Sequence, residues 1–239
     1  MSGYALTDIG MTRSINQDYV FCSDKPVGRI PNLYIVADGM GGHKAGDLAS
    51  RFSVETFTER IVSNGSDNPI TAMSDAIKYT NTRLVELAAT SSDYTGMGTT
   101  FVATTIYGNS AYVANVGDSR LYVLGQDFRQ ITRDHSLVEE MVNNGTLDRS
   151  EARTHTKKNV ITRAVGGGNE VLADFFEVDI MPGDIIFMCS DGLSNMIEDR
   201  DIAAILKKRA GREERARELV DLANRNGGRD NISLIIIEP

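Results

Sequence analysis

Four aspartates stand beside glycine or serine at the ends of strongly apolar segments of the chain. Asp38, Asp118 and Asp191 each come just after such a segment, and Asp230 comes just before one. The apolar segments are 33–37, 111–116, 185–189 and 232–238. Because antiparallel neighbours place the end of one strand beside the start of the next, we expect these four carboxylates to share one edge of a sheet.

A group of carboxylates at one place favours a cation site. Any one of these aspartates can be an ordinary turn residue. Two unit charges about 4 Å apart, however, repel by about 1 kcal/mol in water and about 4 kcal/mol at an effective dielectric of about 20, so a group of them requires a counter-charge. Oxygen ligands suit Mg²⁺ or Mn²⁺, whereas three histidines and two cysteines leave zinc few ligands.

Residues near the first aspartate extend this hypothesis. Asp38 opens the glycine-rich stretch 38–42, where glycine lets a backbone carbonyl approach a cation and permits positive φ. The spacing is not that of a nucleotide-binding fingerprint. Arg13 lies in a polar loop between two predicted strands, where a guanidinium can bind phosphate oxygens in pairs or can simply be a solvated surface residue. Asp18, just before a strand, is ambiguous on its own.

The elements that position these residues follow from periodicity and turn residues. Two helices are predicted after the third strand, one opening at Gly46 or Asp47 and one running from Pro69 to Ala88. Short polar turns between strands indicate antiparallel pairing, and strands in runs with helices in pairs indicate an α+β fold. Strands are expected at 4–7, 19–22, 33–37, 99–106, 111–116, 121–124, 128–131, 171–178, 185–189 and 232–238, and further helices at 201–209 and 213–226. Residues 134–165 predict a surface excursion with short helical pieces at 137–143 and 149–155.

Composition limits the classes of function. The chain has 239 residues and a net charge of −8, which argues against nucleic acid and anionic membrane surfaces as partners. Two distant cysteines do not suggest a disulfide framework, and no signal peptide or membrane-spanning run is recognisable. We expect one domain over residues 1–239, monomeric and cytoplasmic.

The ordered set of short motifs resembles the metal-dependent type-2C protein phosphatases, in their compact bacterial form, over essentially the whole chain. The motifs are Arg13 with Asn16-Gln17-Asp18, Asp38-Gly39-Met40-Gly41-Gly42-His43, Gly98-Thr99-Thr100, Val116-Gly117-Asp118-Ser119-Arg120, Asn159-Val160-Ile161-Thr162-Arg163, Ser190-Asp191-Gly192-Leu193 and Gly228-Arg229-Asp230-Asn231.

The resemblance implies an αββα sandwich, in which two antiparallel sheets pack face to face between helix pairs, and a flap at about 134–165. It also implies a binuclear Mg²⁺/Mn²⁺ centre. Asp38 would bridge both ions, Asp191 and Asp230 would hold the first, and the Gly39 carbonyl would join Asp38 at the second.

Three further roles are implied by the same resemblance. Asp118, with Asp191, would hold a weaker third ion. Asp18 would orient a metal-bound water, and Arg13 would bind the substrate phosphate. The substrates would be phosphoserine and phosphothreonine proteins, hydrolysed by direct attack of the activated water, and a serine/threonine kinase would be the natural counterpart in signal transduction.

Two positions depart from the family pattern. Gln17 stands where many members have glutamate, and Met40 stands where animal-type members have a histidine proposed as the general acid. His43 lies three residues further on, but a lone loop histidine is more often a solvated or turn residue.

Two rival functions differ in what they require. A two-metal phosphodiesterase or nuclease is disfavoured by the negative net charge and by the lack of a basic aromatic groove. A catalytically silent binding module on the same fold is disfavoured because it has no need for so many mutually repelling acids.

Overall fold

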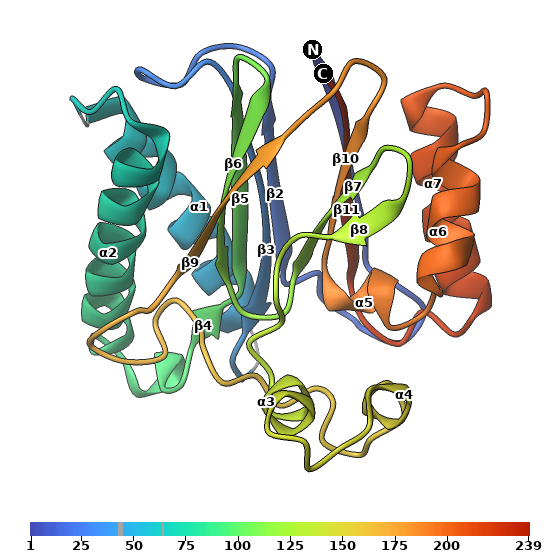
Figure 1. Cartoon of the computed structure of the whole chain (residues 1–239). Coiled ribbons are helices and arrows are strands. Elements are labelled where there is room, and N and C mark those ends of the chain that lie inside the picture. Colours follow the sequence, from blue (N-terminus) through green and yellow to red (C-terminus); the bar gives the residue numbers. More distant parts are fainter. Residues whose placement is uncertain (43–44, 64) are drawn as a thin grey trace.

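Two antiparallel sheets packed face to face form the centre of the computed structural model, which describes residues 1–42, 45–63 and 65–239 (Figure 1). One sheet has the order β1 (Ser2–Asp8), β11 (Ile232–Glu238), β10 (Ile185–Cys189), β7 (Arg120–Leu124) and β8 (Phe128–Gln130). The other has the order β2 (Asp18–Ser23), β3 (Leu33–Met40), β5 (Phe101–Tyr107), β6 (Ser110–Val116) and β9 (Asp174–Asp179), with β4 (Gly98–Thr99) beside β3. The predicted α+β sandwich is confirmed.

Both faces of the central strands are buried, which explains their continuous apolar runs. In β3, Leu33 and Ile35 point toward the helices, whereas Tyr34 and Val36 point into the layer between the sheets. This alternation follows from the two-residue period of a strand. The molecule therefore has three apolar layers, one between the two sheets and one under each helix pair.

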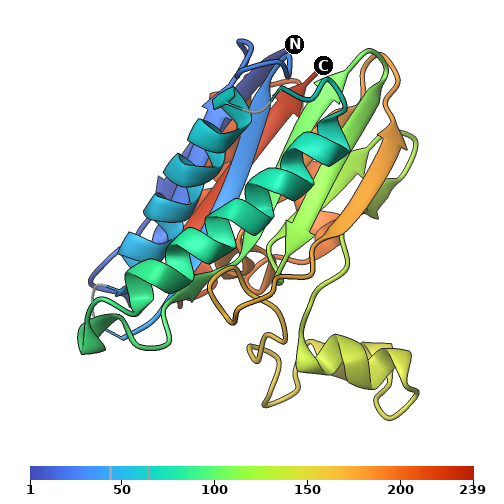
Figure 2. The same cartoon turned by 90° about the vertical axis from the view of Figure 1, so that its left-hand side faces the viewer.

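The helices form two pairs on the outer faces. α1 (Ala45–Ser63) and α2 (Pro69–Ala88) cover the sheet that contains β3, as Figure 2 shows, and α6 (Asp199–Leu206) and α7 (Arg212–Arg225) cover the other. The predicted start of α2 is confirmed, because the Thr71 backbone N–H donates to Asn68 Oδ1 over 2.9 Å and caps the helix ahead of Pro69. The other helices of these pairs differ from the predicted bounds by a few residues.

Residues 134–165, called the flap segment below, lie outside the two sheets (Figure 1). They contain α3 (Leu137–Asn143), which matches its predicted bounds, and α4 (Arg149–Ala152), which ends three residues earlier than predicted. The Ser136 hydroxyl accepts from the Glu139 N–H over 3.3 Å and caps α3. Isolated bridges pair Ser136 with Ile161 and Thr99 with Val165, and the second joins the flap segment to β4.

β1 pairs with β11 along its whole length, from Ser2 opposite Glu238 to Asp8 opposite Ile232. Both termini therefore lie together, at the end of the sandwich away from the flap segment (Figures 1 and 2). No helix in the described ranges is long and apolar enough to cross a bilayer.

Candidate active site

The four aspartates at strand ends meet at one end of the sandwich, beside the flap segment. Asp38 and Asp118 come from β3 and the end of β6 in one sheet, whereas Asp191 and Asp230 flank β10 and β11 in the other. All four line one cavity of about 270 Å³ together with Arg13. The expectation of one shared sheet edge is wrong, because two facing sheets each contribute two of the acids.

Hydrogen bonds to threonines fix the backbone of Asp38. Its N–H donates to Thr100 Oγ1 over 3.0 Å, and its carbonyl accepts from the Thr100 N–H and the Thr99 hydroxyl, both over 2.9 Å. The Thr100 and Ser119 hydroxyls are 2.7 Å apart, which links this point to the loop that carries Asp118. The motif 98–100 therefore holds the backbone of Asp38 in place, a role that the sequence alone does not indicate.

Asp18 lies directly opposite Asp38 in the register of β2 and β3. It is buried, and its Oδ2 accepts from the Ser190 hydroxyl over 2.7 Å, whereas its Oδ1 has no hydrogen-bond partner among the described residues. Burial, with added repulsion from Asp191 and Asp230, raises the pKa of Asp18 to about 7. Like charges directly opposite in a sheet are unfavourable without a counter-charge.

The pKa values of Asp38, Asp191 and Asp118 are shifted in the same direction. Burial, reinforced by the charges of Asp18 and Asp191, raises the pKa of Asp38 well above its ordinary value. Burial and then Asp230 raise the pKa of Asp191 to about 6, and burial and then Asp191 raise that of Asp118. Burial is the first cause of each shift, and repulsion from neighbouring carboxylates adds to it.

The donor set fits divalent cations that prefer oxygen. Carboxylates from two sheets and the backbone of Gly39 surround one cavity, and hard cations such as Mg²⁺ and Mn²⁺ take such ligands. Within the described part of the chain, no three acidic, histidine or cysteine side chains stand close enough to hold a metal ion as placed. The structure therefore shows oxygen donors arranged around a cavity and not a finished coordination sphere.

Gly39 is required for a close backbone approach. A Cβ at this position would lie 2.0 Å from the Gly46 carbonyl oxygen of α1 and 2.7 Å from the Gln17 carbonyl oxygen. The N–H of Gly39 donates to this Gln17 carbonyl over 3.0 Å. Only glycine therefore allows the start of α1 to pack against the segment that follows Asp38.

Arg13 lines the same cavity beside Asp230. Its side chain is 49% exposed, and its guanidinium donates to Asp230 Oδ2 over 2.7 Å. The loop that carries it is held by the buried Asn231, whose Oδ1 accepts from the Gln17 N–H over 2.9 Å and whose Nδ2 donates to two carbonyls of residues 9–15. The side chain of Asn231 therefore joins the Arg13 loop to the start of β11, a role that the sequence alone does not indicate.

The two positions that depart from the family pattern both line the cavity. Gln17 and Met40 add no ionisable group to it. His43 lies outside the described residues.

Facing antiparallel sheets, outer helix pairs and an acid-lined cavity at one end define the metal-dependent class of protein phosphatase. The family model for protein phosphatase 2C matches residues 11–224. The chain belongs to the protein phosphatase 2C family, whose members are metal-dependent phosphatases.

Within that family the chain is similar to compact bacterial members. The serine/threonine phosphatase Stp of Listeria innocua is 38% identical over 211 residues, which cover 86% of this chain and 84% of that protein. The structure of the S. agalactiae serine/threonine phosphatase is 37% identical, with a TM-score of 0.91 over 98% of each chain. The catalytic domain of the serine/threonine protein phosphatase PstP, crystallised with two manganese ions, is 30% identical, with a TM-score of 0.87 over 98% of this chain and 96% of that one.

Proposed function

We propose that this chain hydrolyses phosphoserine and phosphothreonine monoesters of proteins at the acid-lined cavity. The observation that carries the proposal is the convergence of Asp38, Asp118, Asp191 and Asp230 with Arg13 around that cavity. The names of the relatives support the substrate class. When bound, Mg²⁺ or Mn²⁺ would lower the pKa of water at the site and offset charge on the phosphate oxygens, for a direct hydrolysis without a phospho-enzyme.

We keep the ligand roles that the family resemblance implies, and the convergence of the donors on one cavity supports them. Asp38, at the end of β3 between the other acids, would hold both core ions. Asp191 and Asp230, from the facing sheet, would be the other ligands of the first ion. The Gly39 carbonyl would bind the second ion together with Asp38. The two manganese ions of PstP support a pair of ions.

We assign a weaker third ion to Asp118 with Asp191. Both residues line the acid cavity and also the neighbouring cavity under the flap segment. These two carboxylates would hold the ion where the acid cavity adjoins the cavity under the flap segment.

Asp18 and Arg13 act on the reactants. The unpartnered Oδ1 of Asp18 can accept a hydrogen bond from the attacking water and so orient it. Arg13 is half exposed beside Asp230, and its guanidinium can bind two phosphate oxygens at once.

The whole chain, residues 1–239, would act as one catalytic domain with the flap segment beside the site. Its partners would be phosphoproteins and the serine/threonine kinase that phosphorylates them, in signal transduction. A monomeric state and a cytoplasmic location stay predictions from the sequence, as does the exclusion of nucleic acid and membrane.

Metal dependence and substrate class are tested together by one assay. The purified protein is incubated with para-nitrophenyl phosphate, a phosphothreonine peptide or a phosphodiester, in Mn²⁺ and then with excess chelator. We expect release from both monoesters in Mn²⁺ and its complete loss with chelator. Cleavage of the diester alone would support a nuclease, and no cleavage at all would support a silent binding module.

Replacement of Arg13 by alanine should weaken substrate binding more than turnover. If the guanidinium holds phosphate equally in the ground and transition states, KM rises by about tenfold and kcat changes less. Steady-state kinetics on the phosphothreonine peptide measure both constants. Arg29→Ala is the matched control, because Arg29 forms an exposed ion pair with Asp67 and should leave both unchanged. A fall in kcat alone would contradict the assigned role.

A further inference from the structure

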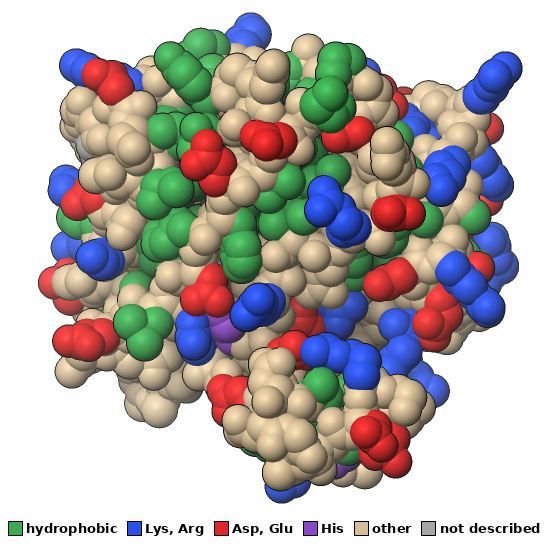
Figure 3. Space-filling model, viewed as in Figure 1, with side chains coloured by type: hydrophobic (Ala, Val, Ile, Leu, Met, Phe, Trp, Pro, Cys, Tyr) green, Lys and Arg blue, Asp and Glu red, His purple; other side chains and the backbone are tan. Residues whose placement is uncertain are grey.

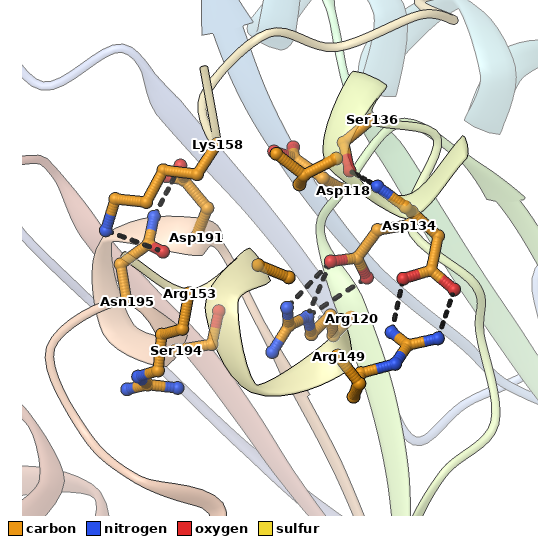
Figure 4. A pocket seen from close by; sticks show the side chains of 13 residues that line it. Asp118, Arg120, Asp134, Ser136, Arg149, Arg153, Lys158, Asp191, Ser194 and Asn195 are labelled. Atoms are coloured by element: carbon orange, nitrogen blue, oxygen red, sulfur yellow. Dashed lines mark hydrogen bonds and ion pairs between the residues drawn. The ribbon is translucent and has the colours of Figure 1, made fainter. Parts of the chain in front are cut away.

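A second cavity, of about 130 Å³, lies between the flap segment and α5 (Asp191–Ser194). It shares Asp118 and Asp191 with the acid cavity, so the two cavities adjoin across these side chains. Figure 3 shows basic and acidic side chains gathered where the flap segment meets the body of the molecule, and Figure 4 shows this cavity from close by.

Two of the cations that line this cavity are paired with carboxylates of the flap segment. Arg120 donates from Nε and one terminal nitrogen to Asp134, over 3.0 and 2.7 Å, and from the other to the Tyr122 hydroxyl over 3.1 Å. Arg149 donates from both terminal nitrogens to Glu139. These arginines therefore serve the structure of the flap segment and its attachment.

Two other cations that line the cavity have N–H donors that make no hydrogen bond to the described residues. Arg153 uses Nε on Glu198 and one terminal nitrogen on the Ile197 carbonyl, both at 2.9 Å, and its second terminal nitrogen makes no hydrogen bond to the described residues. Lys158 donates only to Asn195 Oδ1, over 3.4 Å, and forms no ion pair with any described carboxylate. An ammonium group has three N–H donors, so two remain for a ligand.

Lys158 is held next to the candidate metal ligands. Asn195, which accepts from it, donates in turn from Nδ2 to Asp191 Oδ2 over 2.9 Å (Figure 4). An anion on the Lys158 ammonium would therefore lie one side chain away from Asp191. Because Asp191 and Asp118 would be neutralised by bound cations, the charge left uncompensated in this cavity is positive.

We propose that the cavity under the flap segment binds a second anionic group of the substrate, a carboxylate or a phosphate near the phosphorylated residue. Lys158 and Arg153 supply the donors. This inference rests on the proposed function, since it places one more group of the same phosphoprotein beside the reacting phosphate. The cavity under the flap segment thus selects substrates, and hydrolysis takes place at the acid cavity.

The test uses phosphothreonine peptides in which one residue is varied. The varied position is moved along the peptide on both sides of the phosphothreonine. The variable residue is alanine, aspartate or a second phosphothreonine. At the position that reaches the cavity, we expect the wild-type enzyme to show a KM about five- to tenfold lower for an anionic peptide than for the alanine peptide. Comparison of the aspartate peptides with the doubly phosphorylated peptides shows whether the cavity prefers a carboxylate or a phosphate.

Lys158→Ala should remove this preference and leave hydrolysis of para-nitrophenyl phosphate unchanged, whereas Lys158→Arg should keep the preference. Lys157→Ala is the matched control, because it removes the same charge from the adjacent exposed lysine, which does not line the cavity. This control variant should retain the preference for anionic peptides.

Two outcomes would overturn the inference. One is a wild-type enzyme with no preference at any position. The other is a Lys158→Ala variant with equally reduced kcat on every substrate and weaker Mn²⁺ binding by calorimetry, which would show that Lys158 acts through Asn195 on Asp191. In both cases the proposed function would still be supported if the wild-type protein hydrolyses para-nitrophenyl phosphate in Mn²⁺. The proposed function itself fails only if the wild-type protein lacks that activity.

Discussion

Replacing Asp38 by asparagine should lower phosphatase turnover by about a thousandfold or more and leave the protein folded. The side chain lies among four other carboxylates, those of Asp18, Asp118, Asp191 and Asp230, and is the one assigned to both core ions. Its backbone is held by main-chain and threonine groups that the substitution does not touch. The measurement is kcat on para-nitrophenyl phosphate across a Mn²⁺ titration, and a near-wild-type rate at saturating Mn²⁺ would contradict the ligand assignment.

The same substitution should stabilise the metal-free protein. An amide in place of a carboxylate removes like-charge repulsion from this group of acids. A gain of about 1 kcal/mol corresponds to a rise in Tm of about 2–4 °C for a chain of this size. Thermal unfolding in chelator measures it. Asp127→Asn is the matched control, because Asp127 lies exposed in the turn between β7 and β8 and should change neither Tm nor kcat. An unchanged or lower Tm for the Asp38 variant would argue against repulsion at the site.

Gly192→Ala should weaken both the fold and metal binding. Gly192 follows Asp191 in α5, and a Cβ there would lie 1.9 Å from the Asn231 carbonyl oxygen and 3.2 Å from the Asp230 Cβ. Two backbone segments that carry candidate ligands would have to move apart. We expect a loss of about 1–3 kcal/mol in the free energy of unfolding, as for overpacking elsewhere, together with a weaker Kd for Mn²⁺.

Denaturant unfolding and calorimetric titration with Mn²⁺ measure the two effects of Gly192→Ala separately. Gly211→Ala is the matched control, because a Cβ at Gly211 would meet no atom within 4 Å and its φ of −64° suits alanine. A Gly192 variant with wild-type stability and wild-type Mn²⁺ affinity would show that the close approach to Asn231 is not needed.

Much of this fold could be predicted because its local signals agree with its packing. The apolar runs at 33–37, 185–189 and 232–238 are continuous because both faces of these strands are buried. Asn68 and Pro69 mark the start of α2 by a local cap. The acids were found because each stands at the end of such a run, a pattern visible without any knowledge of distant contacts.

Other features could not be predicted, because they depend on contacts between residues far apart in the chain. The split of the four aspartates between two sheets depends on how the sheets face each other, which no local pattern specifies. The link from Asn231 to the Arg13 loop and the bond from Lys158 to Asn195 span long separations in sequence. α5 is a single turn, too short for a helical period to be recognised.

The pairing of β1 with β11 has a consequence for engineering. Residues 1 and 239 lie side by side at the far end of the sandwich from the acid cavity. A short linker joining them, with new ends opened in the exposed turn 125–127, would give a circular permutant whose reacting groups are undisturbed. A fusion partner attached at residue 1 or residue 239 would likewise project away from the acid cavity.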